Sequence, residues 1–397
     1  MTVWQALVGQ HNAVEVLRAA AVAGRTIADG GAAPPGAMTH SWLFTGPAGS
    51  GRSVAARALA AALQCTHPGE PGCGECRGCH TALAGTHPDV RVITPEGLSI
   101  SVAEIREVVS LAARRPALGR WQVVVIEDAD RLTEGAFNAL LKVVEEPPPR
   151  TVFLLCAPST HPDDVAVTIR SRCRLVSLRI PPAEAVEQVL VAAGVAADRA
   201  RWAAQASQGH VGRARRLARD EQARERRAAV LAIPASLRTL KTCVDAADQL
   251  VRAAEDEAAA LSFDLDAEEA QALQNAMGAG ATGKGTATSI RGMAGAVKEL
   301  ERRQKSRATR TKRDALDRAL VDLAAFYRDV LLVHAGATTP LAHPDFEDEA
   351  RTVAHYVDAP AVLRRLDAVL ACRLALEQNV KPIIAVQALT ASLRLPG

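Results

Sequence analysis

Hydrophobic and polar positions divide the chain into two regions of different pattern. Over the first 180 residues, short continuous apolar runs alternate with segments whose apolar residues recur every three or four positions. The runs are typical of strands buried on both faces of a parallel sheet, and the amphipathic segments are typical of helices. The predicted strands are residues 42–45, 89–93, 122–126, 151–157 and 174–178, and helices between them include 102–114 and 134–145. This alternation predicts an α/β domain with a five-stranded parallel sheet.

After the Pro181-Pro182 pair the strand pattern stops. Three short helices are predicted at residues 183–193, 198–208 and 212–219. Helical periodicity then continues from about residue 225, and its one interruption, residues 277–285, predicts a mobile loop rich in glycine, alanine and threonine. We expect three domains, at residues 1–179, 180–225 and 226–397.

A glycine-rich loop joins the first predicted strand to a helix. Residues 46–53 read Gly-Pro-Ala-Gly-Ser-Gly-Arg-Ser and match the phosphate-loop pattern Gly-x4-Gly-Lys-Ser/Thr except at the lysine. Such a loop wraps phosphates with backbone N–H groups at a helix N-terminus. Arginine is wider than lysine and fork-shaped, so binding of ATP and Mg²⁺ can survive where hydrolysis does not. The candidate nucleotide-binding residues of this loop are Gly46, Gly49, Gly51, Arg52 and Ser53.

Two carboxylates, Glu127 and Asp128, end the third predicted strand. In phosphate-loop ATPases an acid at this point holds Mg²⁺, and a glutamate polarises the attacking water. Here the usual Asp-Glu order is reversed, which displaces each carboxylate by about one methylene, and reaction rates are sensitive to displacements of about 1 Å. We expect the swap to weaken hydrolysis. The alternative is that the two acids simply cap the end of the strand.

Four cysteines lie close together in the sequence, at Cys65, Cys73, Cys76 and Cys79. Two pairs have Cys-x2-Cys spacing, which lets neighbouring thiolates bind one ion in a tight turn. In a chain without a secretion signal, such a cluster favours zinc over disulfides, and an iron–sulfur cluster is the competing interpretation. Four thiolates leave no open position for a substrate, so the predicted zinc is structural.

Composition and charge narrow the class of protein. The 397 residues carry a net charge of +3 and only 3% aromatic side chains, which argues against a surface devoted to nucleic acid. No apolar run approaches the roughly 20 residues that cross a bilayer. The N-terminal residues do not have the pattern of a signal peptide. We therefore expect a cytoplasmic protein without membrane contact.

A basic segment, residues 298–313, carries eight basic and two acidic residues. A solvated helix face is one interpretation of this pattern. A patch that contacts phosphate groups or another subunit is the other.

Two further motifs identify a family. Residues 138–148 read Asn-Ala-Leu-Leu-Lys-Val-Val-Glu-Glu-Pro-Pro, and residues 168–173 read Thr-Ile-Arg-Ser-Arg-Cys. These motifs resemble the bacterial DNA polymerase III clamp-loader family of AAA+ proteins. The glycine-rich loop, the four cysteines and Val8-Gly9-Gln10, which in the family leads into the nucleotide pocket, match it as well. The resemblance implies an AAA+ core (1–179) with a zinc module (65–79), a helical lid (180–225) and a helical collar for oligomerisation (226–397).

Three departures from the family's motor subunits concern the nucleotide site. The chain has Arg52 in place of lysine, Glu127-Asp128 in place of Asp-Glu, and Gly212 where the arginine of the lid aligns. These departures resemble the delta-prime branch of the family, a stator with a degenerate nucleotide site. The resemblance implies that Arg172 of the Ser-Arg-Cys motif acts in trans, in the nucleotide site of a neighbouring motor subunit. The alternative for Arg172 is an ordinary surface or salt-bridging arginine.

The resemblance also implies partners and a place in the cell. The expected partners are the gamma/tau and delta subunits and, through the assembly, the sliding clamp and primed DNA at the nucleoid-associated replisome. The implied function is to help load the clamp during DNA replication, while another subunit carries out polymerisation. Two alternatives remain: an active gamma/tau-type ATPase motor that tolerates Arg52, and a free-standing AAA+ regulator.

Overall fold

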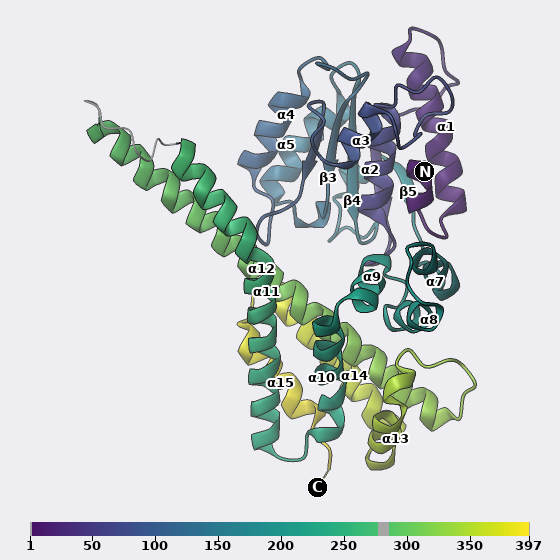
Figure 1. Cartoon of the computed structure of the whole chain (residues 1–397), viewed down its shortest axis with the longest axis vertical. Coiled ribbons are helices and arrows are strands. Elements are labelled where there is room, and N and C mark those ends of the chain that lie inside the picture. The colour runs from purple at the N-terminus through teal and green to yellow at the C-terminus, as the bar shows by residue number, and fades with distance from the viewer. Residues whose placement is uncertain (1, 277–285, 397) are drawn as a thin grey trace. The chain divides into compact units, whose positions relative to one another are not determined.

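The computed structural model describes residues 2–276 and 286–396 (Figure 1). The loop expected at residues 277–285 lies outside the described residues. The chain forms two compact units, Met1–Pro95 with Ser99–Ala218, and Glu96–Leu98 with Arg219–Gly397. The division expected at residue 225 falls within one helix, α10 (Glu221–Ser236). The three-domain division stays a prediction.

The first unit is built on a parallel sheet of five strands in the order β2-β3-β4-β1-β5. Three of its strands, β1, β3 and β4, are buried along their whole length, as their continuous apolar runs predict. The strands are β1 (Ser41–Thr45), β2 (Val90–Ile93), β3 (Gln122–Ile126), β4 (Thr151–Ala157) and β5 (Arg174–Ser177). The predicted five-stranded parallel sheet is confirmed.

Helices cover both faces of this sheet (Figure 1). Trp42 and Phe44 of β1 pack in one cluster with Leu59 of α2, whereas Leu43, which points to the opposite face, packs with Leu140 of α5. The helices of the unit are η1 (Val3–Ala6), α1 (His11–Ala28), α2 (Arg52–Leu63), α3 (Arg77–Leu83), α4 (Val102–Ala112), η2 (Ala129–Arg131), α5 (Glu134–Glu145), α6 (Val167–Arg170), α7 (Ala183–Ala192), α8 (Ala197–Ala206) and α9 (Val211–Arg219).

The described residues of the second unit form helices and connecting loops. Its core includes the fully buried rings of Phe326 and Tyr327, which meet edge to face with centroids 5.7 Å apart. The helices are α10, α11 (Leu240–Ala276), α12 (Thr286–Ala335), η3 (Pro344–Phe346), α13 (Glu347–Tyr356), α14 (Ala359–Glu377) and α15 (Pro382–Leu393). The all-helical C-terminal region expected from the sequence is confirmed.

A buried ion pair lies within this helical core. Arg227 of α10 is only 4% exposed. Its guanidinium Nη1 and Nη2 atoms lie 2.6 and 3.0 Å from the two carboxylate oxygens of Asp345, and Nη2 lies 2.8 Å from Nδ1 of His343. The pair therefore joins α10 to the loop that leads into α13.

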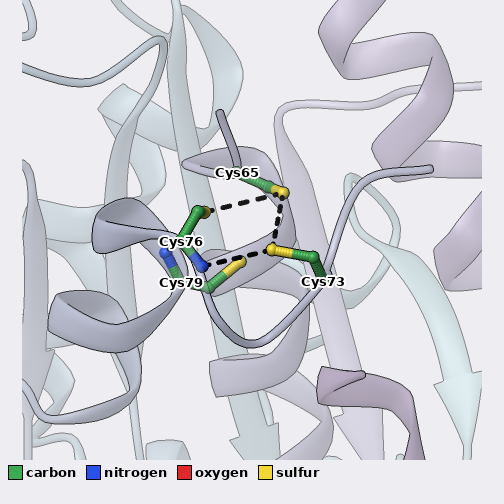
Figure 2. A group of neighbouring side chains, drawn as sticks. All are labelled: Cys65, Cys73, Cys76 and Cys79. Atoms are coloured by element: carbon green, nitrogen blue, oxygen red, sulfur yellow. Dashed lines mark hydrogen bonds between the residues drawn. The ribbon is translucent and has the colours of Figure 1, made fainter. Parts of the chain in front are cut away.

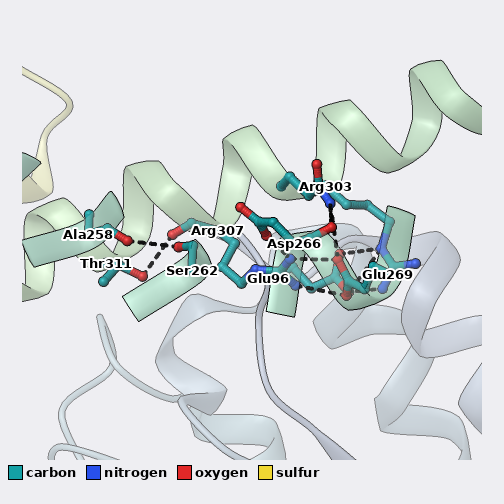
Figure 3. A network of polar contacts seen from close by, with 9 residues as sticks. Glu96, Ala258, Ser262, Asp266, Glu269, Arg303, Arg307 and Thr311 are labelled. Atoms are coloured by element: carbon teal, nitrogen blue, oxygen red, sulfur yellow. Dashed lines mark hydrogen bonds and ion pairs between the residues drawn. The ribbon is translucent and has the colours of Figure 1, made fainter. Parts of the chain in front are cut away.

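The basic segment 298–313 lies on α12 and is matched by acidic side chains. Figure 3 shows Arg307 pointing from α12 toward α11, where its Nη2 lies 2.5 Å from Asp266 and 2.6 Å from Glu269. Lys312 pairs with Glu255 of α11. These ion pairs, in which Arg307 and Lys312 are only 19% and 23% exposed, occupy two of the segment's basic residues within the unit, and both interpretations of the segment stay predictions.

No helix in the described part of the chain is both long enough and apolar enough to span a bilayer.

Candidate functional site

The glycine-rich loop leaves the carboxyl end of β1 and leads directly into α2. Gly46, Gly49 and Gly51 all have positive φ angles, of 154°, 86° and 92°. A Cβ atom on Gly46 would lie 2.5 Å from the carbonyl oxygen of Leu178, and one on Gly49 would lie 2.9 Å from the Cα of His210. Only glycine fits this path.

Gln10 holds the loop against the chain segment that follows β5. Its buried amide donates from Nε2 to the carbonyl oxygens of Ser50 (3.2 Å) and Arg179 (2.6 Å), and its Oε1 accepts from the Arg179 backbone N–H (3.2 Å). Gln10 therefore joins the glycine-rich loop to the segment that follows β5.

Glu127 follows β3 and lies at the same, carboxyl edge of the sheet as the loop. Its Oε1 accepts a hydrogen bond from Nε of Arg57 (2.8 Å), a residue of α2, and its Oε2 accepts one from Oγ1 of Thr94 (3.2 Å). Asp128 has a left-handed backbone, with φ at 56°. Each oxygen of Glu127 thus accepts one hydrogen bond within the unit, and the Arg57 guanidinium offsets part of its charge.

Three buried polar atoms at this edge have no hydrogen-bond partner among the described residues: Ser50 Oγ, Arg52 Nη1 and Asp130 Oδ1. Burial, with the nearby charge of Asp128, raises the pKa of Asp130 to about 6. An unpartnered guanidinium nitrogen beside a glycine-rich helix N-terminus fits an anionic oxygen such as that of a phosphate. The loop thus fits an anion.

The four cysteines come together in one cluster between α2 and α3 (Figure 2). Their Sγ atoms all lie within 4.8 Å of one another, and Sγ of Cys65 is 3.8 Å from those of Cys73 and Cys76. A tetrahedral zinc site with Zn–S bonds of about 2.3 Å requires sulfur separations of about 3.8 Å. The cluster could therefore hold a metal ion.

Backbone N–H groups point at these sulfur atoms. The N–H of Cys76 donates to Sγ of Cys73 (3.3 Å), and the N–H groups of Cys79 and Thr66 donate to Sγ of Cys76 (3.5 Å each). Burial opposes ionisation of the Cys76 thiol, but these donors outweigh it and lower its pKa to about 5. Thiolates are the form in which cysteines bind metals.

The N-terminal segment packs onto the cysteine loop. The backbone N–H of Val3 donates to the carbonyl of Gly72 (3.0 Å), and the indole N–H of Trp4 donates to the carbonyl of Pro71 (3.1 Å). Nη2 of Arg25 donates to the carbonyl of Cys65 (3.3 Å). The cysteine module therefore anchors the segment that leads to Gln10.

Arg172 lies on the surface between α6 and β5, at the other edge of the sheet. β5 runs parallel to β1 and Arg174 pairs with Trp42 near the start of β1, so Arg172 is close to the amino edge, opposite the glycine-rich loop. Its Nη2 lies 2.8 Å from Oε1 of Glu145, and its side chain is 41% exposed. The structure thus brings the loop residues and the two acids to one edge and leaves Arg172 at the other.

Sequence reasoning did not select four residues that shape these sites: Arg57, Asp130, Glu145 and His210. Glu145 lies inside the motif at residues 138–148, and Asp130 follows the Glu127-Asp128 pair by two residues, so both positions were open to sequence reasoning. No local pattern marks Arg57 or His210. Arg57 contacts Glu127 and His210 lies against Gly49, and both contacts join segments that are far apart in the chain.

Comparisons with known proteins match the first unit. A family model described as DNA polymerase III, delta subunit, matches residues 32–182. The DNA polymerase III subunit delta' of Pseudomonas aeruginosa is 38% identical over 174 residues, which cover 39% of this chain and 52% of that protein. The DNA polymerase III subunit tau of Bacillus subtilis is 37% identical over 138 residues, which cover 34% of this chain and 24% of that protein. The predicted resemblance to the delta-prime branch is confirmed over the matched residues.

The chain spans about half the length, or less, of these curated relatives. Among solved structures, a DNA polymerase III, gamma subunit-related protein from Thermotoga maritima aligns over 89% of this chain and 93% of its own, with a TM-score of 0.37 and 17% identity.

Proposed function

We propose that this chain is a delta-prime subunit of the DNA polymerase III clamp loader and serves as the stator of that assembly. In this role it binds the gamma/tau and delta subunits and helps them to place the sliding clamp on primed DNA during replication. The lid (180–225) and collar (226–397) are part of this proposal, with the collar as the oligomerisation domain. The proposal starts from the similarity to proteins named subunit delta'.

The observation that carries the stator assignment is the pairing of Glu127 with Arg57 and Thr94. In a motor subunit the acid at this position holds Mg²⁺, and a guanidinium 2.8 Å from the carboxylate weakens its attraction for a cation. In this chain a cation from the same unit already neutralises that carboxylate. Gly46, Gly49, Gly51, Arg52 and Ser53 then form a loop that can receive phosphate oxygens, while Glu127 and Asp128 do not support hydrolysis.

Arg172 is the residue that we assign to a reaction in a neighbouring subunit. It lies at the edge opposite the chain's own glycine-rich loop, with two-fifths of its side chain exposed. An arginine supplied in trans stabilises the charge that develops on the transferred phosphoryl group and is worth about 10³–10⁵ in rate.

Zinc is the metal that we propose for the cysteine cluster. Four cysteine sulfurs within 4.8 Å of one another fit it, and with Cys65, Cys73, Cys76 and Cys79 as ligands no position stays open for substrate. Its role is structural, as an anchor for the N-terminal segment.

A gamma/tau-type motor is the second candidate. The unpartnered Nη1 of Arg52 favours it, because that nitrogen can contact a nucleotide phosphate. The similarity to a tau subunit favours it as well.

One experiment separates the two candidates. Steady-state ATP turnover is measured for the isolated protein, and for the loader reconstituted with wild-type chain or with Arg172→Ala. The stator predicts no appreciable turnover alone, and a loader that assembles with Arg172→Ala but hydrolyses ATP at least tenfold more slowly. Turnover by the isolated chain that Arg52→Ala abolishes, or a loader rate unchanged by Arg172→Ala, would contradict it.

A further inference from the structure

We propose that Glu145 is a positioning residue for Arg172, and this inference rests on the proposed function of Arg172 in trans. The two residues lie in different elements: Glu145 is the last residue of α5, and Arg172 follows α6. The ion pair between them connects the Leu-Leu-Lys-Val-Val-Glu-Glu motif to the Ser-Arg-Cys motif.

The contacts of Arg172 with described residues leave two of its five N–H donors unused. Nη1 donates to the carbonyl of Thr168 (2.9 Å) and to Oγ of Ser171 (3.2 Å), and Nη2 pairs with Glu145 (2.8 Å). No hydrogen bond or ion pair to a described residue uses Nε. The guanidinium is therefore held by its two terminal nitrogens, while Nε–H and the second N–H of Nη2 can each donate to a phosphate oxygen.

The backbone at both ends of the ion pair is fixed by buried neighbouring residues. Ile169 of α6 and Val144 of α5 are almost completely buried in the same apolar cluster. The backbone N–H of Arg172 donates to the carbonyl of Ile169 at 3.0 Å, which closes the turn that carries the arginine. Because the two Cα positions are fixed by packing, the carboxylate determines the direction of the guanidinium.

The exposure of the pair shows what it can contribute. The side chains are 41% and 40% exposed, and ion pairs in such positions contribute about 0–1 kcal/mol to stability. The ion pair contributes more to orientation than to stability. An arginine side chain has many rotamers, and catalysis is sensitive to misplacement by about 1 Å. Glu145 thus limits the conformations of Arg172 in the free subunit, before a neighbour's nucleotide reaches it.

The test uses the loader reconstituted with full-length chain, clamp and primed DNA. We expect Glu145→Ala to lower kcat for ATP about threefold to tenfold with little change in KM, because the arginine acts on the transition state. Glu145→Gln keeps an acceptor at the same length and restores part of the rate. Glu146→Ala, which removes the adjacent exposed carboxylate, is the matched control and leaves kcat unchanged.

A double variant decides whether Glu145 acts through Arg172. In an Arg172→Ala background, Glu145→Ala is expected to have no further effect on kcat. An equal loss in both backgrounds, or an unchanged or higher kcat for Glu145→Ala alone, overturns the positioning role while the function proposed for Arg172 stands. If Arg172→Ala itself has no effect, the proposed function fails and this inference fails with it. Unchanged melting temperatures of the variants confirm that folding is intact.

Discussion

At the residue scale, Asp130 carries an unfavourable charge for the folded state. It lies two residues after Asp128, its Oδ1 is buried without a hydrogen-bond partner among the described residues, and Arg52 compensates only in part. Burying a carboxylate without donors is costly, so the folded chain retains the proton at higher pH than the unfolded chain does. The pKa of Asp130 rises from 3.8 to about 6 for this reason.

This shift predicts a pH dependence of stability. A raised carboxyl pKa means that the native state binds the proton more tightly than the unfolded state does. The protonated Asp130 therefore adds to the free energy of unfolding, fully below about pH 4, and this gain is lost as the pH rises through 6. At pH 7.5, Asp130→Asn should therefore raise the free energy of unfolding by about 1–2 kcal/mol. Urea unfolding at pH 4.5 and 7.5 measures this, and the gain should shrink at the lower pH.

Asp163→Asn is the control, since the side chain of Asp163 is 91% exposed. It should change stability little at either pH. An Asp130→Asn variant that is less stable than wild type at pH 7.5 would show that the charged form of Asp130 stabilises the fold.

At the scale of helices and strands, local pattern predicts most boundaries. β3, β4 and α5 have the bounds that apolar periodicity predicts, and β1 begins one residue earlier, at Ser41. The helix predicted at 102–114 ends earlier, at Ala112, because Pro116 disfavours helical backbone before it, and a buried carboxylate then organises the loop. Asp89 accepts hydrogen bonds from the backbone N–H groups of Ala117 (2.6 Å), Leu118 (2.8 Å) and Gly119 (2.5 Å). Periodicity cannot predict such bonds, since they join distant segments.

The same limit applies to the sites. Spacing alone identified the cysteine cluster, because chelation by Cys-x2-Cys pairs is a local property. The partners of Glu127 and of Arg172 come from other elements, and no local pattern encodes them. The sequence therefore predicts which residues carry the chemistry, while the fold determines which of them are already paired.

One prediction belongs to the contact between the cysteine module and the N-terminal segment. Removing the bound metal with a chelator, or substituting Cys73→Ser, should free the Gly72 and Pro71 carbonyls from Val3 and Trp4. Hydrogen–deuterium exchange of residues 3–10 is then expected to become about tenfold faster or more. Exchange of residues 46–51 should also become faster, because the Gln10 side chain donates a hydrogen bond to the Ser50 carbonyl.

Cys243→Ser serves as the comparison, since this buried cysteine lies in the helical unit. Exchange of residues 3–10 should not change in it. Metal removal without faster exchange of these residues would show that the N-terminal segment is held independently of the cysteines.

At the scale of the whole molecule, the two compact units carry different aromatic reporters. All four tryptophans, Trp4, Trp42, Trp121 and Trp202, lie in the first unit, and both tyrosines, Tyr327 and Tyr356, lie in the second. Each unit has its own apolar core. Chains of this kind need not unfold in a single step. Tryptophan fluorescence therefore follows the α/β unit, whereas far-UV circular dichroism follows both units.

This separation allows the buried ion pair of the helical unit to be tested. Arg227→Ala removes the buried guanidinium that pairs with the partly exposed Asp345 carboxylate and should destabilise that unit by about 2 kcal/mol. In urea, the circular dichroism transition should move to lower concentration while the tryptophan transition stays in place. Arg351→Ala removes an exposed pair with Glu347 and should move neither. Equal shifts of both signals for Arg227→Ala would mean that the units unfold together.

The strand order has a consequence for how the chain is made. β1 lies between β4 and β5, and Leu43 pairs with Leu155 on one side and Leu175 on the other. On a translating ribosome, the apolar residues Trp42–Phe44 emerge long before either neighbour has been synthesised. The nascent chain must keep this segment from aggregating until residues 151–177 leave the exit tunnel, because such distant pairings form late. Because β1 lies between two strands that are made later, we expect its apolar residues to need chaperone protection during synthesis.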